Sequence, residues 1–210
     1  QPSRQAWFFA AMALAGVGIF GYATGVLMGP LAPVLGDRLP ELTCLQVAFT
    51  GARFAAVFGS FTTDQQAAIA QLLIPGDVVF AWGYGLLLTG LLGLLTLRLP
   101  AAWQPAGRVL TWTPLLASAL DCLEDLALHT LAVAPAGSDP GLLPLLAGIA
   151  ATLKYLNLSV LAPAYGIAGS IRGLAHDRRI GALVIYLLVV VNSLAFIAVL
   201  GARMRYMQVE

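Results

Sequence analysis

Five long apolar segments constrain this chain more than any other feature. Each is long enough to cross a bilayer as a helix, which takes about 20 residues. The segments are residues 7–34, 77–97, 109–134, 142–171 and 180–201. Only 10% of the residues are charged, against about 25% in an average soluble domain, and the alternation typical of membrane-spanning strands is absent. The sequence therefore predicts an all-α, polytopic transmembrane helical bundle of five spans, a single membrane domain over residues 1–210 surrounded by membrane lipids.

The longest connection, between the first two spans, predicts short helices of its own. Thr50 can cap a helix that carries Phe54 on its apolar side, and Thr62 with Gln65 forms a capping-box pattern before a second helix. Because both helices are short and amphipathic, we expect them to lie on the spanning helices. Residues 45–75 are therefore predicted to form an extracytoplasmic helical lid.

Basic residues near the ends of the spans predict the orientation. Six of them fall on the N-terminal side of the membrane and four on the opposite side. The six are Arg4, Arg98, Arg108, Arg172, Arg178 and Arg179, and the four are Arg38, Arg53, Arg203 and Arg205. By the positive-inside rule the N-terminus is then cytoplasmic and the C-terminus lies outside. The net charge of +1 offers no basic stripe to phosphates, so no nucleic-acid partner is expected.

The third span carries an acidic cluster in an otherwise apolar helix. Asp121, Glu124, Asp125 and His129 share an arc of about 140° on a helix of about 3.6 residues per turn. One ionisable group near the bilayer centre costs about 2.5–3.5 kcal/mol, so several together are normally shielded, paired or functional. The sequence therefore predicts that this face points into the bundle.

Lys154 in the fourth span is the expected partner of this acidic face. The third and fourth spans are joined by a short loop and run antiparallel, which places Lys154 at the depth of Asp121. With Asp121 or Glu124 within about 4 Å, the lysine can stay charged in the interior. Asn157 lies one turn beyond Lys154 on the same face.

The second span adds two polar residues, Asp77 and Tyr84, which are seven residues apart and nearly aligned on a helix. We expect Asp77 near the outer surface, within reach of His129, with the other acids and Lys154 at greater depth. A polar column then runs through the bundle. The predicted ligand-binding residues are Asp77, Tyr84, Asp121, Glu124, Asp125, His129, Lys154 and Asn157.

Several functions compete for this cluster. Three acids against one lysine leave surplus negative charge, which favours a binding site for a small or amphiphilic (lipid-like or cationic) ligand, with proton-coupled transport as an extension. A purely structural cluster, or an accessory subunit of a larger membrane complex, needs no ligand. An intramembrane lipid-modifying or metal-dependent enzyme could use the carboxylates for acid–base work. In that alternative one hard divalent ion binds to Asp121, Glu124, Asp125 and His129.

No cofactor is predicted, because haem needs an axial ligand and a second intramembrane histidine is absent. No catalytic residue is assigned either.

The first span contains Gly21, Gly25 and Gly29, a repeated small-xxx-small pattern. Small residues at this spacing let two helices approach closely. The pattern predicts tight packing within the bundle. The alternative is that this face joins two copies of the chain or docks on a larger complex.

The run from about residue 45 to 154 resembles a group of small, uncharacterised bacterial membrane proteins. The resemblance rests on an extracytoplasmic helix followed by three short motifs, which here read Asp77 with Gly83-Tyr84, Asp121 with Glu124, and Leu153-Lys154. It implies a bacterial inner (plasma) membrane location and implies that these polar residues belong together. It implies no activity.

Overall fold

The computed structural model describes residues 3–135 and 137–207, with side chains as far as Ala198 in the last helix. All regular elements in this part of the chain are helical. They are α1 (Arg4–Tyr22), α2 (Ala32–Leu35), α3 (Leu42–Gln46), α4 (Gly51–Gly59), α5 (Thr63–Gln71), α6 (Val78–Thr96), α7 (Gln104–Leu110), α8 (Thr113–Val133), α9 (Leu143–Leu156), α10 (Ala162–His176) and α11 (Ile180–Met207). Two π-helical turns extend or join them, at Ala23–Met28 and Asn157–Leu161, and Leu72–Asp77 joins α5 to α6 through a kink at which Ile74 has non-helical backbone.

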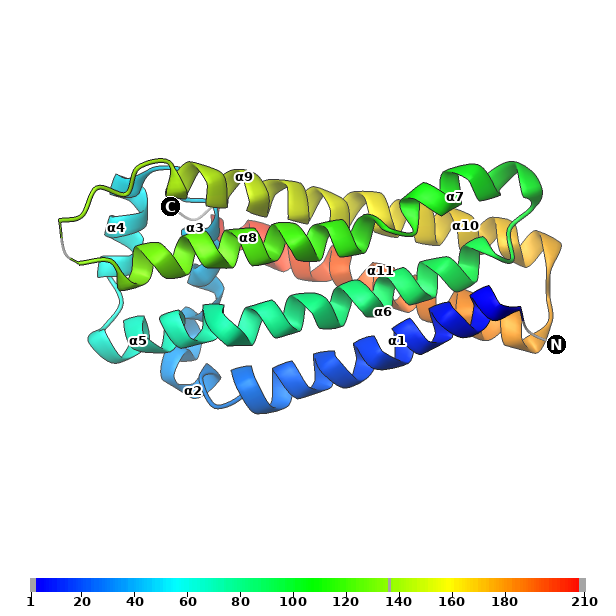
Figure 1. Cartoon of the computed structure of the whole chain (residues 1–210), viewed down its shortest axis with the longest axis horizontal. Helices are drawn as coiled ribbons and strands as arrows, with labels where there is room; N and C mark the ends of the chain where they lie inside the picture. The colour runs from blue at the N-terminus through cyan, green and yellow to red at the C-terminus, as the bar shows by residue number, and fades with distance from the viewer. Residues whose placement is uncertain (1–2, 136, 208–210) are drawn as a thin grey trace.

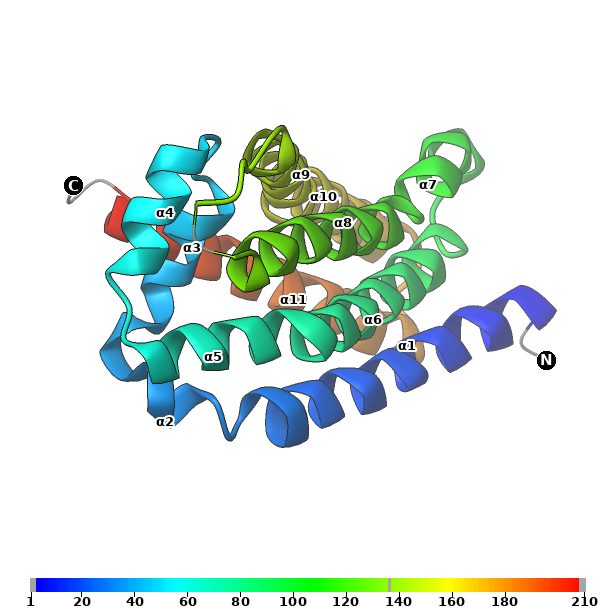
Figure 2. The same cartoon turned by 60° about the vertical axis from the view of Figure 1, so that its left-hand side comes forward.

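The long helices lie side by side and alternate in direction along the chain (Figure 1). α1 and α9 lie on opposite sides of the bundle, with α6 and α8 packed between them, and α11 packs on α6 and α10 (Figures 1 and 2). The short helices α2, α3 and α4 gather at one end, whereas α7 and the start of α1 lie at the other. The core is therefore the centre of an antiparallel helical bundle.

Four helical stretches in the described part of the chain are long and apolar enough to cross a membrane. They are Arg4–Met28, Thr63–Thr96, Leu143–His176 and Ile180–Ala198. α8 has 21 residues and lies between α6 and α9 in the bundle, but its three acids set it apart from these four in composition. The all-helical bundle predicted from the sequence is confirmed at this level.

Prolines decide where the predicted spans are interrupted. The first helical stretch ends at Met28, before Pro30, and not at the predicted Val34. Within the predicted segment 109–134 the chain turns at Thr111–Trp112, and α8 begins anew with Pro114 in its first turn. A proline has no backbone N–H and its ring clashes with the preceding turn, so it suits the first turn of a helix, as at Pro114, and within the longer stretches Pro75 and Pro163 lie at or beside irregular helical turns.

α1 packs against α6 through a face different from the one the glycine pattern predicts. Ala13, Gly16 and Ala23 are the buried positions of this stretch, spaced three and seven apart. Gly21 lies about 140° around the helix from Gly16, and a side chain there or at Gly25 would meet nothing within 4 Å. The prediction that Gly21, Gly25 and Gly29 pack within the bundle is therefore wrong. Because these glycines face outward, the association of two copies of the chain through this face stays a prediction.

Two short helices lie between the first two long ones, as predicted, and both begin at the predicted caps. The side chain of Thr50 accepts a hydrogen bond from the backbone N–H of Arg53 at 3.3 Å, where α4 begins. At the start of α5 the Thr62 side chain accepts from the Gln65 backbone N–H at 3.3 Å, and the Gln65 side chain accepts from the Thr62 N–H at 3.2 Å. These bonds satisfy backbone donors that a helix N-terminus otherwise leaves open.

Arg38 ties the chain before α3 to the turn between α4 and α5. Its guanidinium donates to the Glu41 carboxylate at 3.0 and 2.5 Å and to the backbone carbonyl of Ser60 at 2.7 Å. It also lies 4.0 Å from the centre of the Phe61 ring. The hydrogen bond from Arg38 lowers the pKa of Glu41 from its ordinary value. This contact holds the short helices together over the end of the bundle.

Candidate functional site

A buried ion-pair network joins α8 to α9 in the middle of the bundle. The ammonium group of Lys154 pairs with the carboxylates of both Asp121 and Glu124, and the Nζ–Oε2 distance to Glu124 is 2.6 Å. The three side chains are between 0 and 5% exposed. Asp121 and Glu124 are three residues apart on α8, so both turn toward the helix that carries Lys154. The pairing predicted from equal depth in antiparallel spans is therefore present.

Tyr84 adds a third helix to this network. Its hydroxyl donates to Oδ2 of Asp121 at 2.8 Å, while Oδ1 of the same carboxylate accepts from Lys154. One turn earlier on α8 the Ser118 hydroxyl donates to the Ala81 carbonyl of α6 at 2.6 Å. α6, α8 and α9 thus converge on Asp121, and its two oxygens are oriented from opposite sides.

Replacing Tyr84 with Phe is expected to destabilise the protein by about 1.5–3 kcal/mol, because it removes a buried hydrogen bond to a charged carboxylate. The change should appear as a lower midpoint of thermal unfolding in detergent. Tyr165→Phe is the matched control: its hydroxyl lies 2.6 Å from that of Thr96, and a neutral pair contributes only about 0.5–1.5 kcal/mol. Equal losses in the two variants would contradict the charged character of the Tyr84 contact.

Three carboxylates meet on the other side of Asp121. One oxygen each from Asp77, Asp121 and Asp125 lie within 4.8 Å of one another. Asp125 is fully buried, and neither of its oxygens has a hydrogen-bond partner in the part of the chain that the structure describes. The cluster therefore holds four carboxylates, those of Asp77, Asp121, Glu124 and Asp125, around one ammonium group.

His129 lies apart from these acids. Its Nδ1 is 3.1 Å from the backbone carbonyl oxygen of Ala70 in α5, and the side chain is half-buried. Asp77 forms a group with Asp121 and Asp125, and its predicted proximity to His129 stays a prediction. α5 and α6 run antiparallel to α8 (Figure 1), and Ala70 of α5 lies beside His129. Asp77 comes seven residues after Ala70, so it lies beside Asp125 and Asp121, which precede His129 by one and two helical turns on α8.

The four metal ligands considered from the sequence do not lie together in the structure either. Of Asp121, Glu124, Asp125 and His129, only Asp121 and Asp125 belong to the carboxylate group described above. Glu124 turns to Lys154. Asn157, the remaining candidate, is buried at the start of the π-helical turn, and its side-chain carbonyl oxygen has no hydrogen-bond partner among the described residues.

A cavity of about 270 Å³ opens beside the ion-pair network. Its polar lining comes from α3, the cluster, the end of α9, the following π-helical turn and α11, and its apolar lining from α1, α6, the same π-helical turn and α11. The polar residues are Gln46, Asp77, Tyr84, Asp121, Lys154, Tyr155, Ser159 and Asn192, and the apolar ones are Phe20, Phe80, Leu87, Leu158, Ala195 and Phe196. The cavity is therefore amphiphilic.

Some lining residues escaped the sequence analysis. Gln46 lies in the short helix α3, and its side-chain oxygen accepts a hydrogen bond from the Tyr155 hydroxyl. The phenylalanines Phe20, Phe80 and Phe196 come from three different helices. Aromatic residues in apolar spans look like ordinary core or lipid-facing residues in a sequence, so no local signal separates these from the rest.

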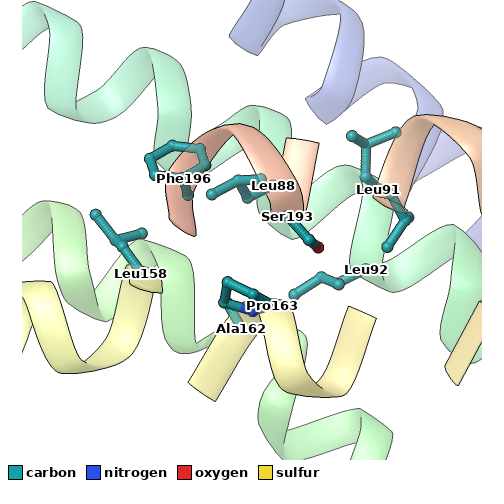
Figure 3. Close-up of a pocket in the computed structure, with 9 residues that line it drawn as sticks. Leu88, Leu91, Leu92, Leu158, Ala162, Pro163, Ser193 and Phe196 are labelled. Atoms are coloured by element: carbon teal, nitrogen blue, oxygen red, sulfur yellow. The ribbon is translucent and has the colours of Figure 1, made fainter. Parts of the chain in front are cut away.

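A second void next to the cavity is too small for a ligand. It measures about 10 Å³, which is at most the space for a single water. Figure 3 shows leucines of α6, with Leu158 and Phe196, around it and the Ser193 side chain directed toward its centre. Leu158 and Phe196 also line the larger cavity, which is thus the only one of the two with room for a small molecule.

The fold and the site together define a class: a helical bundle with the long apolar helices of a membrane protein, built around a buried carboxylate–lysine cluster. Comparison of the chain with protein-family models, with curated proteins and with solved structures gives no match. Its function therefore has to be argued from the site.

Proposed function

We propose that the protein is an integral membrane protein that binds a small amphiphilic ligand in the cavity beside Lys154. The observation that carries this proposal is that one cavity of about 270 Å³ touches both the buried charges and a group of aromatic side chains. A cluster with a purely structural role needs no such space. Ligand pockets combine an apolar lining with a few polar groups that orient the ligand.

The charges of the cluster indicate which end of the ligand binds there. Four carboxylates against one lysine leave a surplus of negative charge next to the cavity. A cationic or hydrogen-bond-donating head group complements that end, while a short apolar tail complements Phe20, Phe80 and Phe196. A lipid-like amine is the simplest molecule with both properties. Coupling of its movement to proton transfer, by the same carboxylates, is an extension of this proposal.

A fifth membrane span, formed by α8, is part of the proposal. The acids of α8 are buried, whereas Leu116, Leu123 and Leu126 on its outer face are 56–61% exposed, as expected where a helix contacts lipid. The start of α1 and the last turns of α11 point to opposite ends of the bundle (Figure 1), which fits an odd number of crossings. We place the N-terminus in the cytoplasm of a bacterial cell and the lid, residues 45–75, outside the inner membrane.

Filling the cavity tests the binding function. Ala195 on α11 lines the cavity, so Ala195→Trp is expected to displace a bound amphiphile. The neighbouring Leu194 is 53% exposed on the outer face, and Leu194→Trp is the matched control. Native mass spectrometry of the purified protein should find a copurified small molecule in the wild-type and Leu194→Trp proteins and lose it in Ala195→Trp. A wild-type protein without any such molecule, or equal occupancy in all three proteins, would contradict the proposal.

A further inference from the structure

We infer that Asp77, Asp121 and Asp125 bind one hard divalent cation, of the Mg²⁺ or Ca²⁺ type, beside the polar end of the cavity. One carboxylate oxygen from each residue lies within 4.8 Å of the others. Such cations hold oxygen ligands at about 2.0–2.6 Å, so two ligands on opposite sides of one ion are up to about 5 Å apart. Small movements of the three side chains therefore bring all three oxygens into one coordination shell.

The surroundings of Asp125 are a second, independent indication that a ligand binds at this place. Its side chain is fully buried and contributes one of the three oxygens, yet neither of its oxygens has a hydrogen-bond partner among the described residues. A buried carboxylate without such partners is strongly unfavourable. The ammonium group of Lys154 is shared by Asp121 and Glu124. A cation held between Asp125 and its two neighbours supplies the missing positive charge.

The chemistry of the ligands selects the kind of cation. Carboxylate oxygens suit Mg²⁺, Ca²⁺ and Mn²⁺, whereas imidazole and thiolate ligands suit zinc and copper. The imidazole of His129 is directed to the Ala70 carbonyl oxygen and is not one of the three ligands. Asp77 and Asp121 both line the cavity, so water there can complete a shell of about six oxygens.

The cation site adjoins the proposed amphiphile site without depending on it. Its three ligands come from the start of α6 and from one face of α8, two elements that pack directly against each other. A bound cation also reduces the surplus of negative charge next to Lys154.

Mn²⁺ is the probe that tests this inference, because its free form is read directly by electron paramagnetic resonance. The full-length protein, purified in detergent and freed of metal with a chelator, is titrated with MnCl₂. We expect one Mn²⁺ per chain, displaced by MgCl₂ or CaCl₂. Asp125→Asn should lose this bound ion, whereas Asp64→Asn, a change at an exposed acid of the lid, should retain it.

A second variant keeps the test decisive if Asp125→Asn fails to fold, which size-exclusion chromatography reports. Asp77 is only partly buried, and Asp77→Asn should also lose the ion. The inference is overturned if the wild-type protein binds no Mn²⁺ at millimolar concentration, or if a folded Asp125→Asn or Asp77→Asn protein binds it as the wild type does. A wild-type protein that carries an amphiphile but binds no Mn²⁺ would contradict the cation site alone. A wild-type protein that binds Mn²⁺ but carries no amphiphile would contradict the amphiphile site alone.

Discussion

Lys154→Met is expected to destabilise the protein by about 3–5 kcal/mol, the largest effect of any single substitution considered for this chain. The lysine is the partner of two buried carboxylates, those of Asp121 and Glu124. Methionine keeps the apolar length of the side chain but leaves both carboxylates without their positive partner in a medium of low dielectric constant. The loss should appear as a much lower unfolding midpoint in detergent.

Neutralising the acids should then restore stability in two steps. Because Lys154 pairs with both acids, Lys154→Met with Asp121→Asn should recover only part of the loss, and the further change Glu124→Gln should recover most of the remainder. Arg98→Met is the matched control, because the Arg98–Asp177 pair at 3.3 Å is partly exposed and such pairs contribute about 0–1 kcal/mol. If the triple variant is no more stable than Lys154→Met alone, the three residues do not form one network.

Gly83→Ala is expected to destabilise the protein by about 1–3 kcal/mol, because it forces α1 away from α6. A Cβ atom at Gly83 would lie 2.6 Å from the backbone nitrogen of Phe20 and 2.7 Å from its Cα. Backbone atoms of a packed helix cannot rotate aside as a flexible side chain can. The repulsion therefore outweighs the gain of up to about 1 kcal/mol that alanine normally brings to a helix relative to glycine.

The control for this prediction is the same change on the outer face of α1. A Cβ atom at Gly21 would meet nothing within 4 Å, so Gly21→Ala should be neutral or raise stability by up to about 1 kcal/mol. Unfolding midpoints of the two variants, measured in one detergent, should move in opposite directions. A loss at Gly21 equal to that at Gly83 would instead indicate that Gly21 forms a contact between copies of the chain.

Local signals in the sequence predicted the elements of this fold well. Thr50 and Thr62 mark the starts of α4 and α5 because a cap acts on the backbone of its own turn. The pairing of Lys154 with Asp121 was predictable because a short loop sets the depth of both residues in neighbouring antiparallel helices. Neither inference needs any knowledge of distant parts of the chain.

Contacts between helices far apart in the sequence were less predictable. The grouping of Asp77 with Asp121 and Asp125 depends on how far the junction of α5 and α6 is shifted along α8, and no local pattern specifies that shift. The aromatic lining of the cavity has the same origin, since Phe20 and Phe196 come from opposite ends of the chain.

The sequence by itself determined that this protein is a bundle of apolar helices with buried acids facing a lysine. Burying unpaired charge among apolar side chains is so unfavourable that few other arrangements are stable. Only the tertiary structure decided which acids meet and where space remains between them. Those features depend on how each helix is rotated and shifted against its neighbours, and close contacts such as that of Gly83 with Phe20 set that rotation.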